Sequence, residues 1–539
     1  MKKALDLYFT SDTHGHILPV DYSTGKEKPG SLLNLSEDIK KSGNTLVLDG
    51  GDNLQGTPLL LYYLEHPGAS LVHPSAVGFR SMQLDYYTLG NHDFNFGYDA
   101  IRNYLDAMPG KCVCANIEDL KGELKFSKTV IHTLENGLKI GITGVVTDFV
   151  NVWELPEHLK NIRVTDAIKA AKAMDEALTG LCDLKVLIYH GGYEEDLVTG
   201  VRLSDTRENI ACEIAGACDY DILLTGHQHM TVAGMWLHGT YTGQPGMNAE
   251  KMLHIMAEVD DIDPSASAAN ASGRNAGSLP EEASAPAHNL KQDRLHVTST
   301  MIPAGEGYDE HAAELLRPLE DKTEQWLDEP IGRLTEEIPP EDKLETAMKG
   351  SRVAAFFNAV QLSTVDAELS LTSLGNAPIG LHKEVSIRDI FTAYPFSNTI
   401  IVKELSGAAL RAALERCACY LEPGEDGKPV FSDVFLKPKV EHYNYDFYAG
   451  LDYAFDIRKP RGQRVVRMRR LDGTEIKASD RIRVAMSNYR STGTGGYPMI
   501  GEAKTVYSGP DNVQDLLTDY VRRKGTVTIQ ENYKFQLLY

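Results

Sequence analysis

Five short apolar runs in the first half of the chain all end in glycine or polar residues, and this repeated ending limits the possible folds more than any other feature. The runs are ALDLYFT (4–10), NTLVLD (44–49), DYYTLG (85–90), LKVLIY (184–189) and YDILLT (220–225), whose length and residue types predict strands. Helix-like stretches separate them, such as DAIKAAKAMDEALTG (166–180). Strands that alternate with helices predict an α/β domain.

Residues of metal-ligand type follow each predicted strand. In chain order they are Asp12 and His14, then Asp52, then Asn91 beside His92, then His190, then His227 and His229. A single Asn, Asp or His after a strand is usually a turn former or a surface residue. Five such endings in succession are not expected by chance. They match the way in which α/β sheets bind their ligands, which is at the carboxyl ends of the strands. The pattern therefore predicts a metal centre.

The types of ligand indicate which metals the centre holds. Imidazole and carboxylate groups without a thiolate favour zinc, manganese or iron over calcium. Seven ligands are too many for one four-coordinate site but fit two ions that share a carboxylate. Two ions about 3.5–4 Å apart serve in-line displacement at phosphorus. We therefore predict two divalent transition-metal ions (Mn, Zn or Fe) that share a bridging carboxylate and a hydroxide, which attacks phosphorus.

Charge and composition restrict the partners and the compartment. The formal net charge of −22 argues against a surface that binds a nucleic-acid polymer. The N-terminal sequence MKKALDLYFTSDTHGH has too short an apolar run for a signal peptide, and no stretch has the roughly 20 apolar residues of a membrane span. Seven cysteines, an odd number, fit a reducing compartment. These features predict a cytoplasmic protein that acts on a small molecule away from membranes; the oligomeric state is left open.

A chain of 539 residues is too long for a single core, so at least two domains are expected. We assign residues 1–305 to the metal-binding domain, 306–333 to a charged linker helix and 334–539 to a second domain with its own α/β pattern. Residues 262–290 are rich in Ala, Ser, Pro and Gly, so we interpret them as a flexible surface insertion in the first domain.

The ordered motifs DTHGH, GGDN, GNHDFNFG, HGG and GHQH resemble those of the calcineurin-like metallophosphoesterases. The second half resembles the C-terminal domain of the 5′-nucleotidases and 2′,3′-cyclic-nucleotide phosphodiesterases. This resemblance implies a four-layer α/β sandwich followed by a second α/β domain that binds nucleotide. It also implies the ligands of each ion: Asp12, His14, Asp52 and His229 for one, and Asp52, Asn91, His190 and His227 for the other.

The same resemblance gives His92 the catalytic role. It would face the phosphate, stabilise the transition state or protonate the leaving alkoxide, while Asp93 is expected to fix the loop. In the 5′-nucleotidase branch, an Asp three residues after this His pairs with it; here the position is Asn95, which holds an imidazolium less strongly. A second Asp of that branch, which contacts free ribose hydroxyls, corresponds here to Gly495. Both departures favour a 2′,3′-cyclic-nucleotide 2′-phosphodiesterase/3′-nucleotidase.

Two aromatic segments of the second half resemble the base-binding segments of that branch. They are YNYDFYAGLDYAFDIRKPRGQRV (443–465) and SNYRSTGTGGYP (487–498). We predict that Tyr443 and Tyr489 sandwich the base, with Tyr445 as the nearest alternative, since stacking tolerates any base. Asn358 and Gln361 are candidates for polar contacts with the nucleotide. The alternative interpretation of these segments is ordinary packing, since Tyr is a good strand former.

Two other functions fit the same motifs. One is a 5′-nucleotidase or a nucleotide-sugar hydrolase built on the same scaffold. The other is a non-catalytic nucleotide-binding protein that keeps its metals. The presence of His92 beside a complete ligand set weighs against the second alternative.

Overall fold

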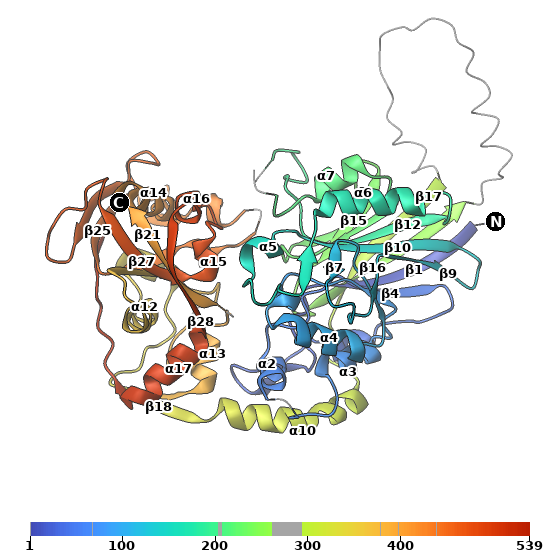
Figure 1. Cartoon of the computed structure of the whole chain (residues 1–539), viewed down its shortest axis with the longest axis horizontal. Helices are drawn as coiled ribbons and strands as arrows, with labels where there is room; N and C mark the ends of the chain where they lie inside the picture. The colour runs from blue at the N-terminus through green and yellow to red at the C-terminus, as the bar shows by residue number, and fades with distance from the viewer. Residues whose placement is uncertain are drawn as a thin grey trace, which may run out of the picture. The chain divides into compact units, whose positions relative to one another are not determined.

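The computed structural model of the chain describes residues 2–539 except residues 67, 203–206, 261–293, 378, 397 and 438. The chain forms two compact units, Met1–Asp21 with Gly25–Asp321, and Tyr22–Thr24 with Lys322–Tyr539 (Figure 1). The insertion predicted at 262–290 lies outside the described residues. The domain limits expected at residues 305 and 334 stay predictions. Within the described ranges, no helix is both long and apolar enough to cross a membrane.

Two sheets form the centre of the first unit. In its described part, the larger sheet has the order β17 (Leu295–Pro303), β16 (Lys251–Asp260), β1 (Lys2–Thr10), β4 (Thr45–Asp49), β5 (Tyr86–Tyr87), β6 (Lys111–Val113) and β8 (Phe126–Ser127). The other has the order β14 (Thr231–Leu237), β15 (Thr240–Pro245), β13 (Ile222–Thr225), β12 (Leu184–His190), β10 (Lys139–Val146) and β9 (Thr129–Thr133). Strands β1, β4 and β5 pair in parallel, as do β10, β12 and β13.

The main core of this unit lies between the two sheets. Leu7 and Phe9 of β1 share one buried cluster with Val186 and Ile188 of β12, because alternate residues of a strand point to the same face. On the outer face of the second sheet, α6 (Ala167–Leu178) and α7 (Ala211–Ala217) pack in another cluster. Helices α2 (Pro58–Glu65), α3 (Pro74–Ser81) and α4 (Gly97–Ala107) lie on the opposite side (Figure 1). The predicted α/β sandwich is confirmed.

Most of the predicted elements are present, but the run DYYTLG forms only the two-residue strand β5. Beyond the strand, the N–H of Gly90 donates to the carboxylate of Asp93 at 2.8 Å, so at this residue the main chain is bonded within its own loop and not to a neighbouring strand. The predicted helix at 166–180 is α6, and Asp166 caps its first turn by accepting from the N–H of Lys169 at 2.9 Å.

The second unit is built around a mixed sheet. In its described part, the strand order is β24 (Asp446–Ala449), β19 (Leu369–Ser373), β27 (Arg481–Ser487), β21 (Thr399–Ser406) and β28 (Lys504–Asn512). Three helices that contact this sheet are α12 (Arg352–Thr364), α14 (Gly407–Cys417) and α17 (Val513–Lys524). The junction between the two units falls within α10 (Glu310–Leu327).

Candidate metal centre

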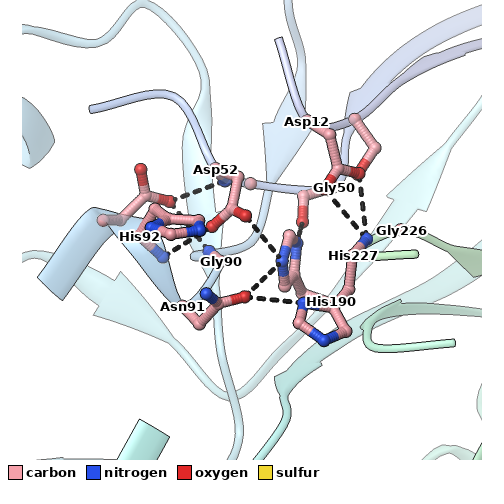
Figure 2. Close-up of polar contacts among 12 residues, drawn as sticks. Asp12, Gly50, Asp52, Gly90, Asn91, His92, His190, Gly226 and His227 are labelled. Carbon is pink, nitrogen blue, oxygen red and sulfur yellow. Dashed lines mark hydrogen bonds and ion pairs between the residues drawn. The ribbon is translucent and has the colours of Figure 1, made fainter. Parts of the chain in front are cut away.

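The predicted ligands meet where strands of both sheets of the first unit end (Figure 2). Asp12 follows β1 and Asp52 follows β4, and these two strands pair in parallel. His190 is the last residue of β12, and His227 comes two residues after the end of the parallel strand β13. The carboxylate of Asp12 accepts the main-chain N–H of His227 at 2.9 Å, which connects the loop of one sheet to the loop of the other.

The seven predicted ligands lie together in two groups. Within each of two sets the candidate ligand atoms all lie within 4.8 Å of one another; the sets are Asp12, His14 and His229, and Asp52, His190 and His227. Asn91 joins the second set, since its Oδ1 lies 3.1 Å from His190 Nε2 and 2.8 Å from His227 Nδ1. This division agrees with the one implied by the family resemblance, except that Asp52 is grouped with one set alone. Its role as a bridge stays a prediction.

The main chain at these ligands adopts a conformation that side chains normally avoid. Nine non-glycine residues of the described chain have positive φ, and five of them are predicted ligands: Asp12 (54°), His14 (48°), Asp52 (61°), His227 (69°) and His229 (58°). Each such residue costs on the order of 1–3 kcal/mol, and strain of this kind gathers at functional sites because the surrounding structure enforces it. The loops are therefore shaped to aim these side chains.

Gly90 allows the second group to close. A Cβ at this position would lie 2.2 Å from Asp52 Oδ1 and 2.6 Å from His190 Cε1. No side chain fits in that space, so only glycine permits the loop with Asn91 to approach these two residues. The glycine that begins the motif GNHDFNFG is thus required by packing.

Hydrogen bonds at the rear of three histidines determine which nitrogen faces the centre. In each ring the nitrogen that points away from the ligand set lies against an oxygen that can only accept, so this nitrogen donates a hydrogen there and the other nitrogen points to the centre. The acceptors are Gln55 O for His14 Nδ1 (3.1 Å), Gly50 O for His190 Nδ1 (2.7 Å) and Glu208 Oε1 for His227 Nε2 (2.9 Å).

The atoms that face the centre fit cations. Nε2 of His14 lies 3.0 Å from Nε2 of His229, and both rings belong to one ligand set, so the two nitrogens are close enough to bind the same ion. Asp52 Oδ2 is buried and makes no hydrogen bond within the described structure, although His190 Nε2 lies 3.2 Å away. A buried carboxylate oxygen without a donor is costly, and a metal ion satisfies it.

The electrostatics of the pair Asp52 and His190 point the same way. Burial acts to raise the pKa of Asp52, but the neighbouring His190 and His92 outweigh it and hold that pKa well below its usual range. Burial likewise acts to lower the pKa of His190, but the carboxylate of Asp52 outweighs it and raises this pKa to about 10. The carboxylate thus favours positive charge at this point of the centre, which a divalent ion supplies.

Asp93 holds the two central loops together, as the sequence led us to expect. Its carboxylate accepts the N–H groups of Gly90, Asp52, Asn53 and Leu54 at 2.8, 3.0, 2.7 and 2.9 Å. Four main-chain donors on one buried side chain fix both loops. Asp93 therefore shapes the centre without belonging to either ligand set.

His92 lies beside the centre and outside both ligand sets. Its N–H donates to Asp52 Oδ1 at 2.7 Å, and its ring centroid lies 5.6 Å from that of His14 (Figure 2 labels His92). Its Nδ1 lies 2.8 Å from Asn95 Oδ1. This position beside the ligands suits the role predicted for it.

Two residues that the sequence did not indicate touch the predicted ligand His227. Glu208 accepts from its Nε2, and the ring of Trp153, the last residue of α5 (Val150–Trp153), stacks on its ring at 5.3 Å and 25°. Neither residue follows a strand or belongs to a motif. Their proximity to His227 is a product of tertiary packing, and no local pattern signals it.

In the second unit, Tyr443 and Tyr489 approach each other. Their rings are half-buried, 6.4 Å apart between centroids and inclined at 70°. Tyr445, Asn358 and Gln361 lie in the interior instead. Tyr445 stacks on Tyr420, and Asn358 and Gln361 donate to main-chain carbonyls at 2.9 and 3.4 Å. Within the structure these three side chains are engaged by the protein itself, and their contacts with substrate stay a prediction.

Comparison with known families matches both halves of the chain. Residues 5–231 match the calcineurin-like phosphoesterases, and residues 330–502 match the 5′-nucleotidase C-terminal domain. Together the two matches span more than half of the chain.

Individual proteins show similarity along the whole chain. The trifunctional nucleotide phosphoesterase protein YfkN of Bacillus subtilis is 24% identical over 97% of this chain, which spans 38% of that protein's length. The 2′,3′-cyclic-nucleotide 2′-phosphodiesterase/3′-nucleotidase of Haemophilus influenzae is 22% identical, with 98% of this chain and 87% of that protein covered. A solved structure from Staphylococcus aureus, provisionally named a 5′-nucleotidase, has 28% identity and a TM-score of 0.84 over 100% of both chains.

The candidate ligands at the strand ends, the two sheets that carry them and the matches to both domains all indicate the same family. The family to which the first domain belongs hydrolyses phosphoric esters with a dinuclear centre of divalent metal ions, and both candidate ligand groups are present here. This chain therefore belongs to the calcineurin-like phosphoesterases that carry a 5′-nucleotidase C-terminal domain.

Proposed function

We propose that this chain hydrolyses nucleotide phosphoesters as a 2′,3′-cyclic-nucleotide 2′-phosphodiesterase/3′-nucleotidase. The observation that carries the proposal is the convergence of seven ligand residues beside His92, in a chain whose second half matches the 5′-nucleotidase C-terminal domain. One divalent ion would be held by Asp12, His14 and His229, and the other by Asn91, His190 and His227, with Asp52 between them. Ions in such a centre supply Lewis acidity toward phosphoryl oxygens and activate water at neutral pH.

The metals proposed are manganese, zinc or iron. Four imidazoles and three oxygen ligands without a thiolate suit these ions. The amide of Asn91 contributes an oxygen without a negative charge, so the centre stays attractive to a phosphate anion. The substrate proposed is a free nucleotide.

His92 would give a proton to the leaving ribose oxygen. Its Nδ1 is engaged by Asn95, so Nε2 is the nitrogen proposed to face the substrate. Proton transfer by a positioned side chain contributes typically about 10²–10⁴-fold to the rate.

The preference for phosphate at the ribose 2′ and 3′ oxygens rests on Asn95 and Gly495. Gly495 has φ of +80°, and a Cβ there would lie 2.2 Å from Asn444 Oδ1 and 2.7 Å from Arg490 Nη1. The Asp that contacts free ribose hydroxyls in the 5′-nucleotidase branch would therefore clash at this position. A substrate whose 2′ and 3′ oxygens carry the phosphate does not need that Asp.

Tyr443 and Tyr489 are proposed to stack on the base. Arg490 joins the two segments that carry them, since its buried guanidinium pairs with Asp446 at 2.9 Å and donates to the carbonyl oxygen of Tyr443 at 3.3 Å. This buried ion pair fixes the main chain beside both rings, which limits the entropy lost when a base binds between them.

A 5′-nucleotidase is the second candidate function. It is supported by the likeness to the Staphylococcus aureus structure, which is 28% identical to this chain with a TM-score of 0.84. A panel of 2′,3′-cyclic AMP, 3′-AMP and 5′-AMP with added manganese separates the two candidates. We expect the highest kcat/KM for the cyclic or the 3′ nucleotide. Highest kcat/KM for 5′-AMP would refute the first candidate in favour of the second.

Replacement of Tyr443 or Tyr489 by Ala is expected to lower kcat/KM for the preferred nucleotide. Loss of a stacked ring costs about 1–3 kcal/mol per base, or about 5–150-fold. The same variants should hydrolyse a small aryl phosphodiester almost normally, because that substrate has no base. Steady-state kinetics on both substrates measure the difference.

The control for this pair is Tyr507→Ala, which removes an exposed ring from the same unit. The stacking proposal is wrong if Tyr443→Ala and Tyr489→Ala leave kcat/KM for the nucleotide at the value of this control.

A further inference from the structure

The side-chain amide of Asn95 lies between His92 and a buried carboxylate from a distant loop. Asn95 Oδ1 is 2.8 Å from His92 Nδ1, and Asn95 Nδ2 donates to Glu154 Oε2 at 2.8 Å. The Glu154 side chain is 6% exposed. A carboxylate is therefore connected to His92 through the side-chain amide of Asn95. In the 5′-nucleotidase branch, the Asp of the His–Asp pair contacts this histidine directly.

The carboxylate of Glu154 determines how the amide is oriented. Besides Asn95, it accepts from the N–H of Leu155 at 2.7 Å and from His158 Nδ1 at 2.7 Å, so all three of these partners are donors. A carboxylate can only accept, so Asn95 must turn its NH2 toward Glu154 and its oxygen toward His92. That oxygen in turn requires a hydrogen on His92 Nδ1, which leaves Nε2 as the nitrogen for chemistry.

The segment that carries Glu154 is packed against the centre by an independent contact. Glu154 directly follows α5, and the preceding Trp153 stacks on the ligand His227. Glu154 also holds its own loop through the main chain of Leu155. The carboxylate is therefore held in a fixed place relative to the metal ligands.

We propose that Glu154 is a positioning residue that sets the tautomer and the ring orientation of His92 through Asn95. This inference rests on the role of His92 proposed above. In this His–Asn–Glu series, the Glu154 carboxylate fixes which way the Asn95 amide is turned, and the amide oxygen in turn fixes the His92 ring. In serine proteases, a wrong tautomer of the catalytic histidine costs about 10⁴-fold, which shows how much such a positioning group contributes.

The test exchanges the amide and the carboxylate that form the hydrogen bond between Asn95 and Glu154. In Glu154→Gln, the new amide has two possible orientations. Its NH2 either faces Asn95, which then turns its own oxygen away from His92, or faces Leu155 and His158, where donor meets donor. In Asn95→Asp, two carboxylates face each other across 2.8 Å. In the double variant, Asn95→Asp with Glu154→Gln, every donor again has an acceptor. The new amide at position 154 donates to the new carboxylate at position 95, so this hydrogen bond runs in the opposite direction.

We expect each single variant to lower kcat by at least about tenfold and the double variant to recover most of that loss. The full chain loaded with Mn²⁺ is assayed on phenyl phosphate and p-nitrophenyl phosphate. The loss should be large for the phenyl ester and small for the p-nitrophenyl ester, whose leaving group needs no proton. Metal content should match the wild type, since none of these groups is a ligand.

Glu157→Gln is the matched control, because it removes the same charge from an exposed position three residues away. Several results would overturn the proposal: single variants as active as this control, a double variant no better than the singles, equal losses on both esters, or loss of metal in Glu154→Gln. The last would mean that Glu154 acts on the centre directly. Because both substrates lack a nucleoside, the outcome is independent of the nucleotide panel; a wild type inactive on every substrate would instead refute the proposed function.

Discussion

Replacement of Asp52 by Asn is expected to abolish turnover and to weaken metal binding more than any other single change. In the structure Asp52 Oδ1 accepts the N–H of His92, so an Asn would keep its oxygen there and turn its NH2 to the position of Oδ2. That position lies 3.2 Å from His190 Nε2. The amide would then donate to the nitrogen that faces the centre, where a cation requires lone pairs.

Metal analysis and kinetics of the purified variant measure this effect. Wild-type protein should carry up to two transition-metal ions, and chelation should abolish its activity until Mn²⁺ or Zn²⁺ is restored. Asp99→Asn, an exposed change of the same kind on α4, serves as the control and should keep both metal and activity. An Asp52→Asn protein with normal metal content and normal turnover would contradict the dinuclear centre, as would activity that is insensitive to chelation.

His92→Ala is expected to lower kcat by about 10²–10⁴-fold while metal content stays near normal. His92 lies outside both ligand sets, so its removal takes away a proton donor without opening a coordination site. The loss should be largest for esters with poor leaving groups and smallest for p-nitrophenyl phosphate, whose leaving oxygen departs without a proton. Parallel metal analysis and kinetics on both kinds of ester check this result.

The exposed His66 provides the control for this change, since His66→Ala removes an imidazole of the same unit that lies outside the motifs. Loss of both metals from His92→Ala would mean that His92 acts as a ligand or as a support for the centre. Equal losses on all esters would mean that it does not protonate the leaving group.

The sequence predicted the strand ends well because a strand and the loop after it are local features. The apolar runs before Asp12, Asp52, Asn91 and His227 are short and follow a regular pattern, and the polar residue after each run is read directly from the chain. Where the sequence was less successful, at DYYTLG, the extra apolar residues belong to a loop held by Asp93 and not to a longer strand.

Aromatic and amide residues of the second unit were harder to interpret. Tyr443 and Tyr445 are two residues apart in one segment, yet one ring is half-buried and the other is packed inside on Tyr420. Asn358 and Gln361 lie on the buried face of α12, where their amides satisfy main-chain carbonyls. Burial depends on what packs against a residue, and composition alone does not indicate it.

The two-part α/β organisation and the seven candidate ligands could be inferred from the amino-acid sequence, because periodic apolar runs and the residues after them are encoded along the chain. The folded structure was needed to show which nitrogen of His14, His190 and His227 faces the centre, and that Glu208 and Glu154 lie behind His227 and Asn95. Asn95 and Glu154 are 59 residues apart, and their contact depends on the packing of α5 against a loop of the other sheet. Contacts of this kind arise from the shape of the folded core, which no local pattern of residues specifies.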